Sequence, residues 1–339
     1  METIRKDISG FIIENIEAHS SDIVPFTAQH FGISRQRAHA YIHRLIKQGK
    51  IIKTGKTRAS HYYSITGKVI QFSEKIRPGL AEDRVWTQYA RPKLISLPEN
   101  VYRICNYGFS EIYNNAIDHS NGKVIFTRIE TDNENVVITI MDNGIGIFEK
   151  IQKALSLDSI RESILHLSKG KFTTDPSKHT GEGIFFTSRM FDSFSILSSD
   201  MYYTFKDEDW FLSHERREDF GKGTFIRMII STSTKKTANE IMNKYADSEI
   251  GFGKTIVAVK LSSDSDDPHV SRSQAKRLLM GLDRFRQIIL DFKRVEVIGP
   301  AFVDEVFRVF QTEHPEIKIE YINASPDLEA MIQRIRPTT

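Results

Sequence analysis

The stretch Asp142-Asn143-Gly144-Ile145-Gly146-Ile147 decides how the central part of the chain is interpreted. It directly follows the apolar run from Val136 to Met141, which predicts a strand. Another such run, from Lys123 to Glu130, comes before it, and the polar turn Asp132-Asn133-Glu134-Asn135 joins the two, so that together they predict a hairpin. An acidic residue and two glycines therefore stand where the second strand of the hairpin ends.

A long helix is predicted before this hairpin. It begins at Ser96, because Glu99 stands three residues later and completes a capping box. Its polar residues are Glu111, Asn115, Asp118 and His119. Helical spacing places Glu111 and Asn115 on one face, together with either Asp118 or His119. A carboxylate, an amide and another carboxylate on one helical face suit a metal–phosphate site, although such a stripe taken alone is more typical of a solvated surface.

Two glycine motifs follow on the C-terminal side. These are His179-Thr180-Gly181-Glu182-Gly183-Ile184 and Gly221-Lys222-Gly223-Thr224-Phe225, the latter leading into another strand. The order Glu-x-x-x-Asn, Asp-x-Gly-x-Gly, Gly-x-Gly and Gly-Thr resembles the GHKL superfamily of gyrase, Hsp90, histidine kinases and MutL. The resemblance covers residues of about 97 to 232. It implies the Bergerat ATP-binding fold, an α/β sandwich in which helices cover one face of a mixed sheet.

The resemblance also implies roles for single residues. Asn115 would complete the coordination of Mg²⁺, and Glu111 would be the catalytic residue that polarises the attacking water or hydroxyl. Asp142 would accept a hydrogen bond from the adenine amino group of ATP. The further nucleotide-binding positions are Asp118, Gly144, Gly146, Gly181, Gly183 and Thr224. In this family the first glycine pair lets the backbone pass close to the base, and the second opens a helix whose amides face the phosphates.

The segment from Phe148 to Lys178 would be the ATP lid. Its far end is basic, and the candidates to reach the γ-phosphate, among which the sequence does not choose, are Lys169, Lys171, Lys178 and His179. Phe185 stands where a third glycine is often found after the Gly-x-Gly motif. This departure resembles the anti-sigma-factor serine kinases more than the sensor histidine kinases.

The N-terminal end of the chain is basic. Residues 1–68 hold eleven Lys and Arg against five Asp and Glu, whereas the whole chain has a formal net charge of +3. No acidic residue interrupts the basic residues between Arg35 and Arg58. Such a cluster indicates a polyanionic partner, most simply nucleic acid, with a solvated helix face as the alternative.

Local patterns in the same region predict three helices and a hairpin. The helices are expected around Ile4 to Ile16, Pro25 to Phe31 and Arg35 to Gln48, and the strands at Ile51 to Lys53 and His61 to Ile65. This order resembles the winged helix-turn-helix family over residues 1–66. In that family the third helix enters the major groove of duplex DNA and the wing contacts its backbone.

The winged-helix resemblance divides the DNA-binding candidates into two groups. Residues at the exposed start of the third helix, which could contact base edges, are Arg35, Gln36, Arg37 and His39. Residues of the wing, which would contact phosphates, are Lys53, Lys56 and Arg58.

The C-terminal part alternates strands and helices, which predicts a small sheet backed by helices. The strands are expected at Thr255 to Leu261, Gln287 to Phe292 and Ile317 to Ile322, and the helices at Ser271 to Phe285, Pro300 to Gln311 and Pro326 to Ile335. The runs Ile289-Leu290-Asp291-Phe292 and Gly299-Pro300-Ala301-Phe302-Val303-Asp304-Glu305 resemble the STAS-like domains (DUF4325) found beside GHKL modules. The domain is more distantly similar to anti-sigma-factor antagonists, in which a serine takes a phosphate. The best-matching position here is Ala301, which has no hydroxyl and cannot be phosphorylated.

Composition limits the class of protein. The 339 residues are 40% hydrophobic and 27% charged, with a single cysteine, Cys105, so neither a disulfide framework nor a cysteine-rich zinc site is expected. No apolar run approaches the about 18 residues that a membrane span needs, and no apolar signal core follows the first residues. These features predict a soluble cytoplasmic protein.

The predicted fold class is α+β multidomain. We expect a winged helix over 1–66, a connector over 67–96, a GHKL domain over 97–232, a linker helix over 233–250 and a STAS-like domain over 251–339. The preferred function is an ATP-binding regulator in which nucleotide state controls the winged-helix and STAS-like modules on DNA, with slow ATP hydrolysis expected. The alternative is an anti-sigma-type serine/threonine kinase acting on a separate protein. A protein partner of the STAS-like domain and a homodimer are left open.

Overall fold

The computed structural model describes residues 2–16, 19–47, 50–54, 60–64, 68–172, 180–207, 209–214, 222–249, 251–262, 269–295 and 297–335. The chain forms two units, one of residues 1–70 and 129–136 and the other of residues 71–128 and 137–339. Within the described ranges no helix is long and apolar enough to cross a membrane.

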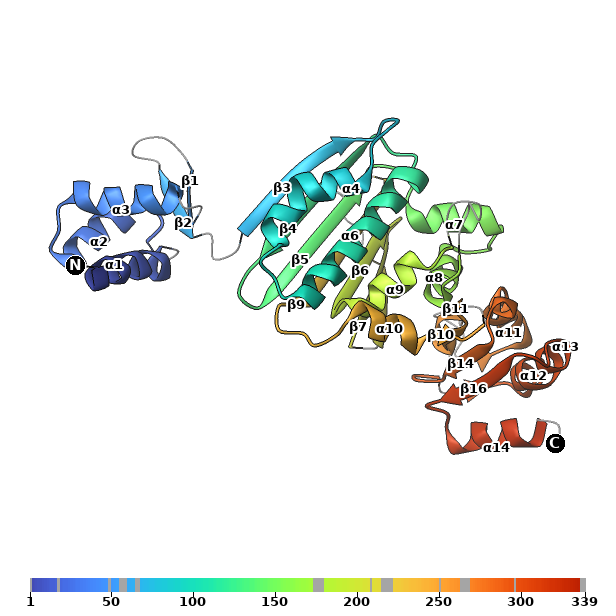
Figure 1. Cartoon of the computed structure of the whole chain (residues 1–339). Helices are drawn as coiled ribbons and strands as arrows, with labels where there is room; N and C mark the ends of the chain where they lie inside the picture. Colours follow the sequence, from blue (N-terminus) through green and yellow to red (C-terminus); the bar gives the residue numbers. More distant parts are fainter. Residues whose placement is uncertain are drawn as a thin grey trace. The chain divides into compact units, whose positions relative to one another are not determined.

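The N-terminal part contains three helices and a two-stranded antiparallel hairpin (Figure 1). The elements are α1 (Glu2–Asn15), α2 (Ile23–Phe31), α3 (Arg35–Lys47), β1 (Ile51–Thr54) and β2 (His61–Ser64). Their predicted order and approximate bounds are confirmed. Apolar side chains from all five elements form one core, which contains Ile8, Ile12, Ile16, Ile23, Tyr41, Ile42, Leu45, Ile51 and Tyr62.

Local sequence explains where α2 ends and α3 begins. Gly32 follows α2 with a φ of +60°, the left-handed conformation that glycine adopts without a steric penalty. The hydroxyl of Ser34 then accepts a hydrogen bond from the amide of Arg37 at 3.2 Å, as expected of an N-cap residue. The tip of the predicted wing, including Lys56 and Arg58, lies outside the described residues.

A seven-stranded sheet forms the centre of the second unit, in the order β3-β4-β5-β9-β6-β7-β8. The strands are β3 (Lys68–Lys75), β4 (Val124–Thr131), β5 (Asn135–Asp142), β6 (Ser193–Ser198), β7 (Met201–Lys206), β8 (Asp209–His214) and β9 (Thr224–Ser231). The strands β6 to β9 pair antiparallel. The segment that we assigned to a connector thus supplies β3, an edge strand of this sheet.

Helices cover one face of the sheet, with α4, α6 and α9 visible in front of it in Figure 1. The helical elements of this region are α4 (Glu82–Val85), the π-helical turn η2 (Trp86–Ala90), α5 (Arg91–Leu94), α6 (Glu99–His119), α7 (Ile147–Leu155), α8 (Ile160–Lys169), α9 (Gly183–Met190) and α10 (Ala238–Lys244). Large side chains between α6 and its neighbours are fully buried, among them Phe109, Tyr113 and Phe191.

The predicted capping box at the start of α6 is wrong. The helix begins at Glu99 after Pro98, and no side chain caps it. A proline disfavours helical backbone in the residue before it, so a helix cannot continue from Ser96 through Leu97.

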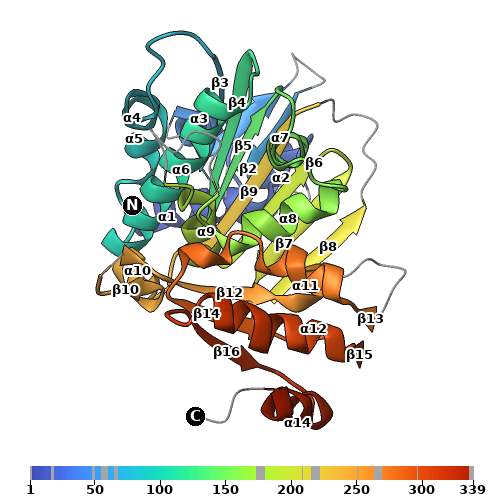
Figure 2. The same cartoon turned by 90° about the vertical axis from the view of Figure 1, so that its right-hand side faces the viewer.

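The C-terminal part has a parallel three-stranded sheet, in the order β12-β14-β16 (Figure 2). Its strands are β12 (Lys254–Ala258), β14 (Gln287–Asp291) and β16 (Lys318–Ile322). The helical elements are η3 (Val259–Ser262), α11 (Arg272–Leu279), η4 (Leu282–Arg284), α12 (Pro300–Asp304), the π-helical η5 (Glu305–Phe310), α13 (Gln311–Glu313) and α14 (Pro326–Ile335). Short pairs are formed by β10 (Ala246–Asp247) with β11 (Gly251–Phe252) and by β13 (His269–Val270) with β15 (Val297–Ile298).

Two predicted C-terminal helices differ from those in the structure. The helix expected from Ser271 to Phe285 ends at Leu279, because Gly281 has a φ of +76° and turns the chain before η4. The helix expected from Pro300 to Gln311 contains the π-helical stretch η5. The last helix, Pro326–Ile335, has the predicted bounds.

Candidate functional site

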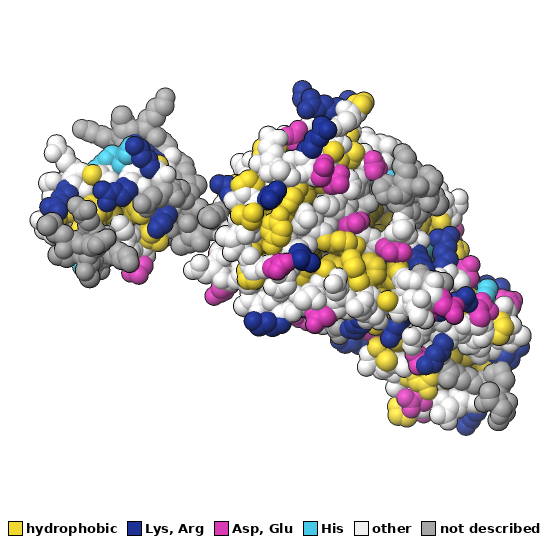
Figure 3. Space-filling model, in the orientation of Figure 1, with side chains coloured by type: hydrophobic (Ala, Val, Ile, Leu, Met, Phe, Trp, Pro, Cys, Tyr) yellow, Lys and Arg dark blue, Asp and Glu magenta, His cyan; other side chains and the backbone are white. Residues whose placement is uncertain are grey.

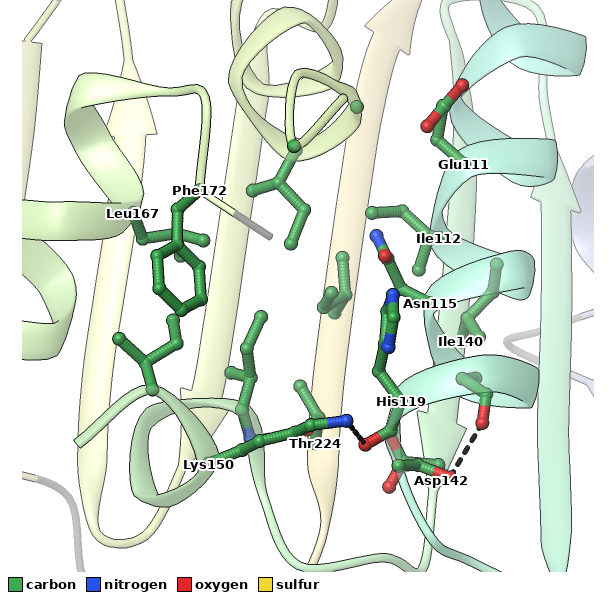
Figure 4. Close-up of a pocket in the computed structure, with 18 of the residues that line it drawn as sticks. Glu111, Ile112, Asn115, His119, Ile140, Asp142, Lys150, Leu167, Phe172 and Thr224 are labelled. Atoms are coloured by element: carbon green, nitrogen blue, oxygen red, sulfur yellow. Dashed lines mark hydrogen bonds between the residues drawn. The ribbon is translucent and has the colours of Figure 1, made fainter. Parts of the chain in front are cut away.

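A cavity of about 270 Å³ lies between α6, the ends of β5 and β9, and the segment from α7 to the start of α9 (Figure 4). The wall from α6 contributes Glu111, Ile112, Asn115 and His119. The wall from the sheet contributes Ile140, Asp142, Thr224 and Ile226. The opposite wall contributes Ile147, Lys150, Ile151, Leu167, Phe172, Thr180, Gly181 and Gly183. Most of the predicted site residues therefore surround one space, but Gly144 is not among the residues that line it.

The α6 wall follows the helical repeat. Glu111, Asn115 and His119 are four residues apart and all line the cavity. Asp118, which we expected to bind nucleotide, is exposed and does not line it. The sequence left open whether Asp118 or His119 shares this face, and the residue that lines the cavity is His119.

Asp142 is the buried carboxylate of the cavity, with only 7% of its surface exposed. Its Oδ1 accepts a hydrogen bond from the amide of Gly144 at 2.8 Å. Burial raises the pKa of Asp142, and hydrogen bonds from Gly144 and from the backbone and hydroxyl of Thr224 oppose that shift. A fixed, desolvated acceptor of this kind pairs with a ligand N–H group and excludes ligands that offer none.

The turn after β5 is fixed from several sides. Asn143 Oδ1 accepts hydrogen bonds from the amides of Lys123 and Val124, at 2.8 and 3.0 Å. The amide of Ile145 donates to the carbonyl of Ser120, just after α6, at 2.9 Å. Thr224 Oγ1 accepts from the amide of Ile147 at 3.0 Å and so connects the start of α7 to β9.

The glycines of the site have structural reasons that the sequence did not reveal. A Cβ at Gly144 would collide with the backbone of Ser120, so this glycine permits close contact with the chain just after α6. The approach to a base that we expected of this position stays a prediction. Gly146 has a φ of +88°, and a Cβ there would meet Ser198 Oγ at 2.6 Å. At Gly183 a Cβ would collide with the carboxylate of Glu111, which lies against the start of α9.

Asp142 and Glu111 lie at opposite ends of the cavity in Figure 4, with Asn115 between them along α6. One end thus presents a buried acceptor, and the other presents a carboxylate, an amide and the start of α9. In the described parts of the chain no group of three or more His, Cys, Asp and Glu residues could hold a metal ion alone. A Mg²⁺ ion accepts few protein ligands and otherwise takes phosphate and water oxygens, so an amide such as that of Asn115 fits it.

Lys150 is a site residue that the sequence analysis missed. Its Nζ donates to the carbonyl of His119 at 2.7 Å and lies across the cavity floor (Figure 4). Burial lowers the pKa of Lys150, and the Asp118 carboxylate opposes that shift. The sequence did hold a signal for Lys150. It stands three residues after Ile147 and one before Ile151 on the amphipathic helix α7, and both of these residues line the cavity.

Two of the four lid residues that we considered as contacts of the γ-phosphate, Lys169 and Lys171, do not line the cavity. Lys169 and Lys171 instead donate hydrogen bonds to C-terminal residues more than a hundred positions away. Lys178 and His179 lie outside the described residues. Phe172 and Leu167 line the cavity wall in this segment, and as apolar residues near a loop they gave no sequence signal.

The predicted base-reading residues lie in the first turns of α3. Arg35, Gln36, Arg37 and His39 are all exposed, whereas Ala38 between them is buried against the core. Lys53 on β1 is also exposed, with its Nζ 5.8 Å from the ring centre of Tyr62. Figure 3 shows Lys and Arg side chains spread over the visible face of this N-terminal part, with little acidic surface.

Two comparisons with protein families agree with the fold. Residues 106–234 match the family described as histidine kinase-, DNA gyrase B-, and HSP90-like ATPase. Residues 274–329 match the STAS-like domain of unknown function (DUF4325). No curated protein matches the sequence. The chain therefore contains a GHKL-type ATPase domain followed by a STAS-like domain, a combination that supports ATP binding and a regulatory role.

Proposed function

We propose that the chain is an ATP-dependent regulator that binds duplex DNA, in which the GHKL-type domain binds ATP with Mg²⁺. The observation that carries the proposal is the buried Asp142 carboxylate, held by Gly144 and Thr224 at one end of the cavity. An adenine amino group is a donor that suits this acceptor. Triphosphate would then extend toward Asn115, Glu111 and the start of α9.

The phosphate end has the groups that the chemistry requires. Asn115 would supply a ligand to Mg²⁺, and the bound ion would neutralise phosphate charge. The amides at the start of α9 are donors for a phosphate oxygen, and the absence of a side chain at Gly183 keeps them accessible beside Glu111. Glu111 is the candidate base that orients and deprotonates an attacking water.

The DNA-binding part of the proposal rests on the surface of α3. Four polar or basic residues of α3 are exposed together at its N-terminal end, which is the end that reads bases in helix-turn-helix proteins. The basic excess of residues 1–68 favours a polyanion as the ligand of this surface.

A titration of the full chain with ATP, with and without Mg²⁺, tests the nucleotide site. Asp142→Asn should weaken ATP binding by about 5- to 150-fold, since losing a charged partner in a buried hydrogen bond costs about 1–3 kcal/mol. Asp158→Asn, at an exposed position outside the cavity, is the matched control and should bind ATP like the wild type. Equal affinity in both variants would contradict the assignment of Asp142.

The serine/threonine kinase alternative depended on Phe185. In the structure Phe185 is 1% exposed, and its ring centre lies 4.6 Å from that of Phe252 and 5.0 Å from that of Tyr245. Packing therefore explains why a phenylalanine stands at position 185 without reference to kinase chemistry. Transfer of a labelled γ-phosphate from ATP to a second protein would favour the kinase.

A further inference from the structure

The end of the lid has two functional faces within six residues. Leu167 and Phe172 line the nucleotide cavity, where both are visible on the wall opposite α6 (Figure 4). Lys169 and Lys171, which lie between them, bind the STAS-like domain. We call residues 167–172 the lid segment. Each of the two cavity residues therefore lies within two positions of a lysine that is bound to the STAS-like domain.

Lys169 makes the most buried of these contacts. Only 2% of its surface is exposed, and its Nζ donates to the carbonyls of Arg277 and Met280, each at 3.0 Å. These carbonyls lie in the last turn of α11 and just after it, where a helix leaves its acceptors without intrahelical partners. The lysine thus caps α11 from another domain.

Thr255 of β12 holds the backbone of the same residue. Its hydroxyl donates to the carbonyl of Lys169 at 2.7 Å, and the threonine is completely buried. The side chain and the backbone of Lys169 are therefore bound by different elements of the STAS-like domain. These buried hydrogen bonds fix the position of Lys169 more firmly than a single ion pair on the surface would.

A reciprocal pair of hydrogen bonds joins Lys171 to Arg284. Lys171 Nζ donates to the carbonyl of Arg284 at 2.8 Å, and Arg284 Nη1 donates to the carbonyl of Lys171 at 3.1 Å. Lys171 has a φ of +56°, an unfavourable conformation for a lysine that these contacts hold in place.

Aromatic packing extends the contact to α9. Phe252 lies against Gly170, where a Cβ would come within 2.8 Å of its ring. The same ring lies 4.6 Å and 4.8 Å, between centres, from Phe185 and Phe186, which follow Gly183 on α9. Two parts of the cavity wall, the lid segment and the start of α9, therefore rest on the region that leads into β12.

We propose that the STAS-like domain controls the affinity of the nucleotide pocket by holding the lid segment through Thr255, Arg284 and the α11 carbonyls. The inference rests on the proposed function, because it concerns regulation of the same ATP site. Leu167 and Phe172 are placed against the nucleotide only while the segment is held. A partner that displaces the STAS-like domain would release them and weaken ATP binding.

Thermodynamic linkage makes the effect reciprocal. If holding the lid segment strengthens ATP binding by some factor, then bound ATP strengthens the contact with the STAS-like domain by the same factor. Binding of nucleotide therefore changes how tightly the STAS-like domain is held to the lid segment, and no covalent step is needed.

Two substitutions on the STAS-like side test the proposal in the full chain. Thr255→Val removes one buried hydroxyl with little change of shape, and Arg284→Ala removes an exposed side chain whose loss leaves the core intact. Neither residue lines the nucleotide cavity. Each should weaken ATP binding by about 5-fold or more, the lower end of typical coupling between sites. Lys276→Met, an exposed change on α11 away from the lid segment, is the control and should leave ATP affinity unchanged.

Hydrogen exchange supplies the reciprocal readout. ATP should slow amide exchange over residues 272–285 in the wild type and in Lys276→Met, but less in Thr255→Val and Arg284→Ala. A residue that merely stabilised the fold would not change this nucleotide dependence. If ATP binds and Asp142→Asn weakens it, while both variants keep wild-type affinity and exchange, the coupling is overturned and the ATP site stands. If the wild type binds no ATP, the proposed function and the coupling both fall.

Discussion

Asn115 and Asn114 are neighbours on α6, but only Asn115 lines the cavity. If Asn115 is the Mg²⁺ ligand, Asn115→Ala should bind ATP equally with and without Mg²⁺, because the ion then has no protein ligand to connect it to the site. Asn114→Ala is a chemically identical change outside the cavity and should keep the Mg²⁺ dependence. Calorimetric titrations of ATP at two Mg²⁺ concentrations make the comparison. A Mg²⁺ effect that survives in Asn115→Ala would place the ion elsewhere.

Glu111 belongs to the same face of α6 and is predicted to act on water, not to bind the nucleotide. Glu111→Gln should retain ATP binding and lower turnover by about 100- to 10,000-fold, the usual cost of removing a general base. Glu99→Gln, an exposed change at the start of the same helix, should hydrolyse ATP at the wild-type rate. Release of labelled phosphate in single-turnover conditions measures both. A wild type that binds ATP without hydrolysing it would indicate a binding-only switch.

Residue types at fixed spacings predicted much of the site. Motifs identified seven residues that the structure brings around one cavity, namely Glu111, Asn115, Asp142, Gly146, Gly181, Gly183 and Thr224. Asp118 was implied by the resemblance, whereas helical spacing allowed either it or His119 to face a site, and His119 lines the cavity. The reasons for Gly144 and Gly183 required coordinates, since they depend on Ser120 and Glu111 approaching from other elements.

Elements with strong periodicity were also predictable. Helices α3 and α14 and the hairpin of β4 and β5 lie close to their expected bounds. Lys169 was one of four lid residues that we considered as contacts of the γ-phosphate, and it binds the C-terminal part of the chain instead. A lysine on a lid is ordinarily solvated, and the acceptors that bury this one lie 108 and 111 positions away along the chain. No local pattern reports such a partner.

The buried Lys169 at the end of α8 predicts a pH dependence of stability. Burial lowers its pKa to about 7, below the value of 10.5 expected in an unfolded chain. The unfolded state therefore binds more protons above pH of about 7, and folding becomes more favourable as pH rises. The titratable or charged groups around it are Glu162 and His166 on α8 and Arg277 on α11.

Urea unfolding of the wild type and of Lys169→Met at pH 6, 7, 8 and 9 measures this effect. The stability of the wild type relative to the variant should be constant below pH of about 7 and then rise by at most about 1.4 kcal/mol per pH unit. Lys276→Met, which removes an exposed lysine from α11, should show no such difference from the wild type. A relative stability that does not change with pH would show that Lys169 stays charged when buried.

At the scale of the whole molecule, the chain combines a basic N-terminal part with an ATPase domain and a STAS-like domain. The regulatory proposal requires that ATP change how the chain binds DNA. If the two sites are linked, DNA must change ATP affinity by the same factor that ATP changes DNA affinity. Measuring both factors on the full chain tests the link without assuming its direction, and factors of one in both measurements would show that the two sites are not coupled.

The proposed DNA-binding surface gives different predictions for two kinds of side chain. Lys53→Ala, on strand β1 of the predicted wing, should weaken binding to every duplex alike and reduce the slope of log affinity against log salt by about one unit, because one phosphate contact is lost. Arg35→Ala or Arg37→Ala, at the start of α3, should instead reduce discrimination at one base pair by about 1–3 kcal/mol if the guanidinium reads a guanine edge. Lys123→Ala, an exposed change in the central domain, should alter neither quantity. Titrations of the full chain against random and genomic duplexes at two salt concentrations separate these effects. Failure to bind any duplex at low salt would leave the exposed surface of α3 as a protein contact, since its basic residues would then have no polyanion to neutralise.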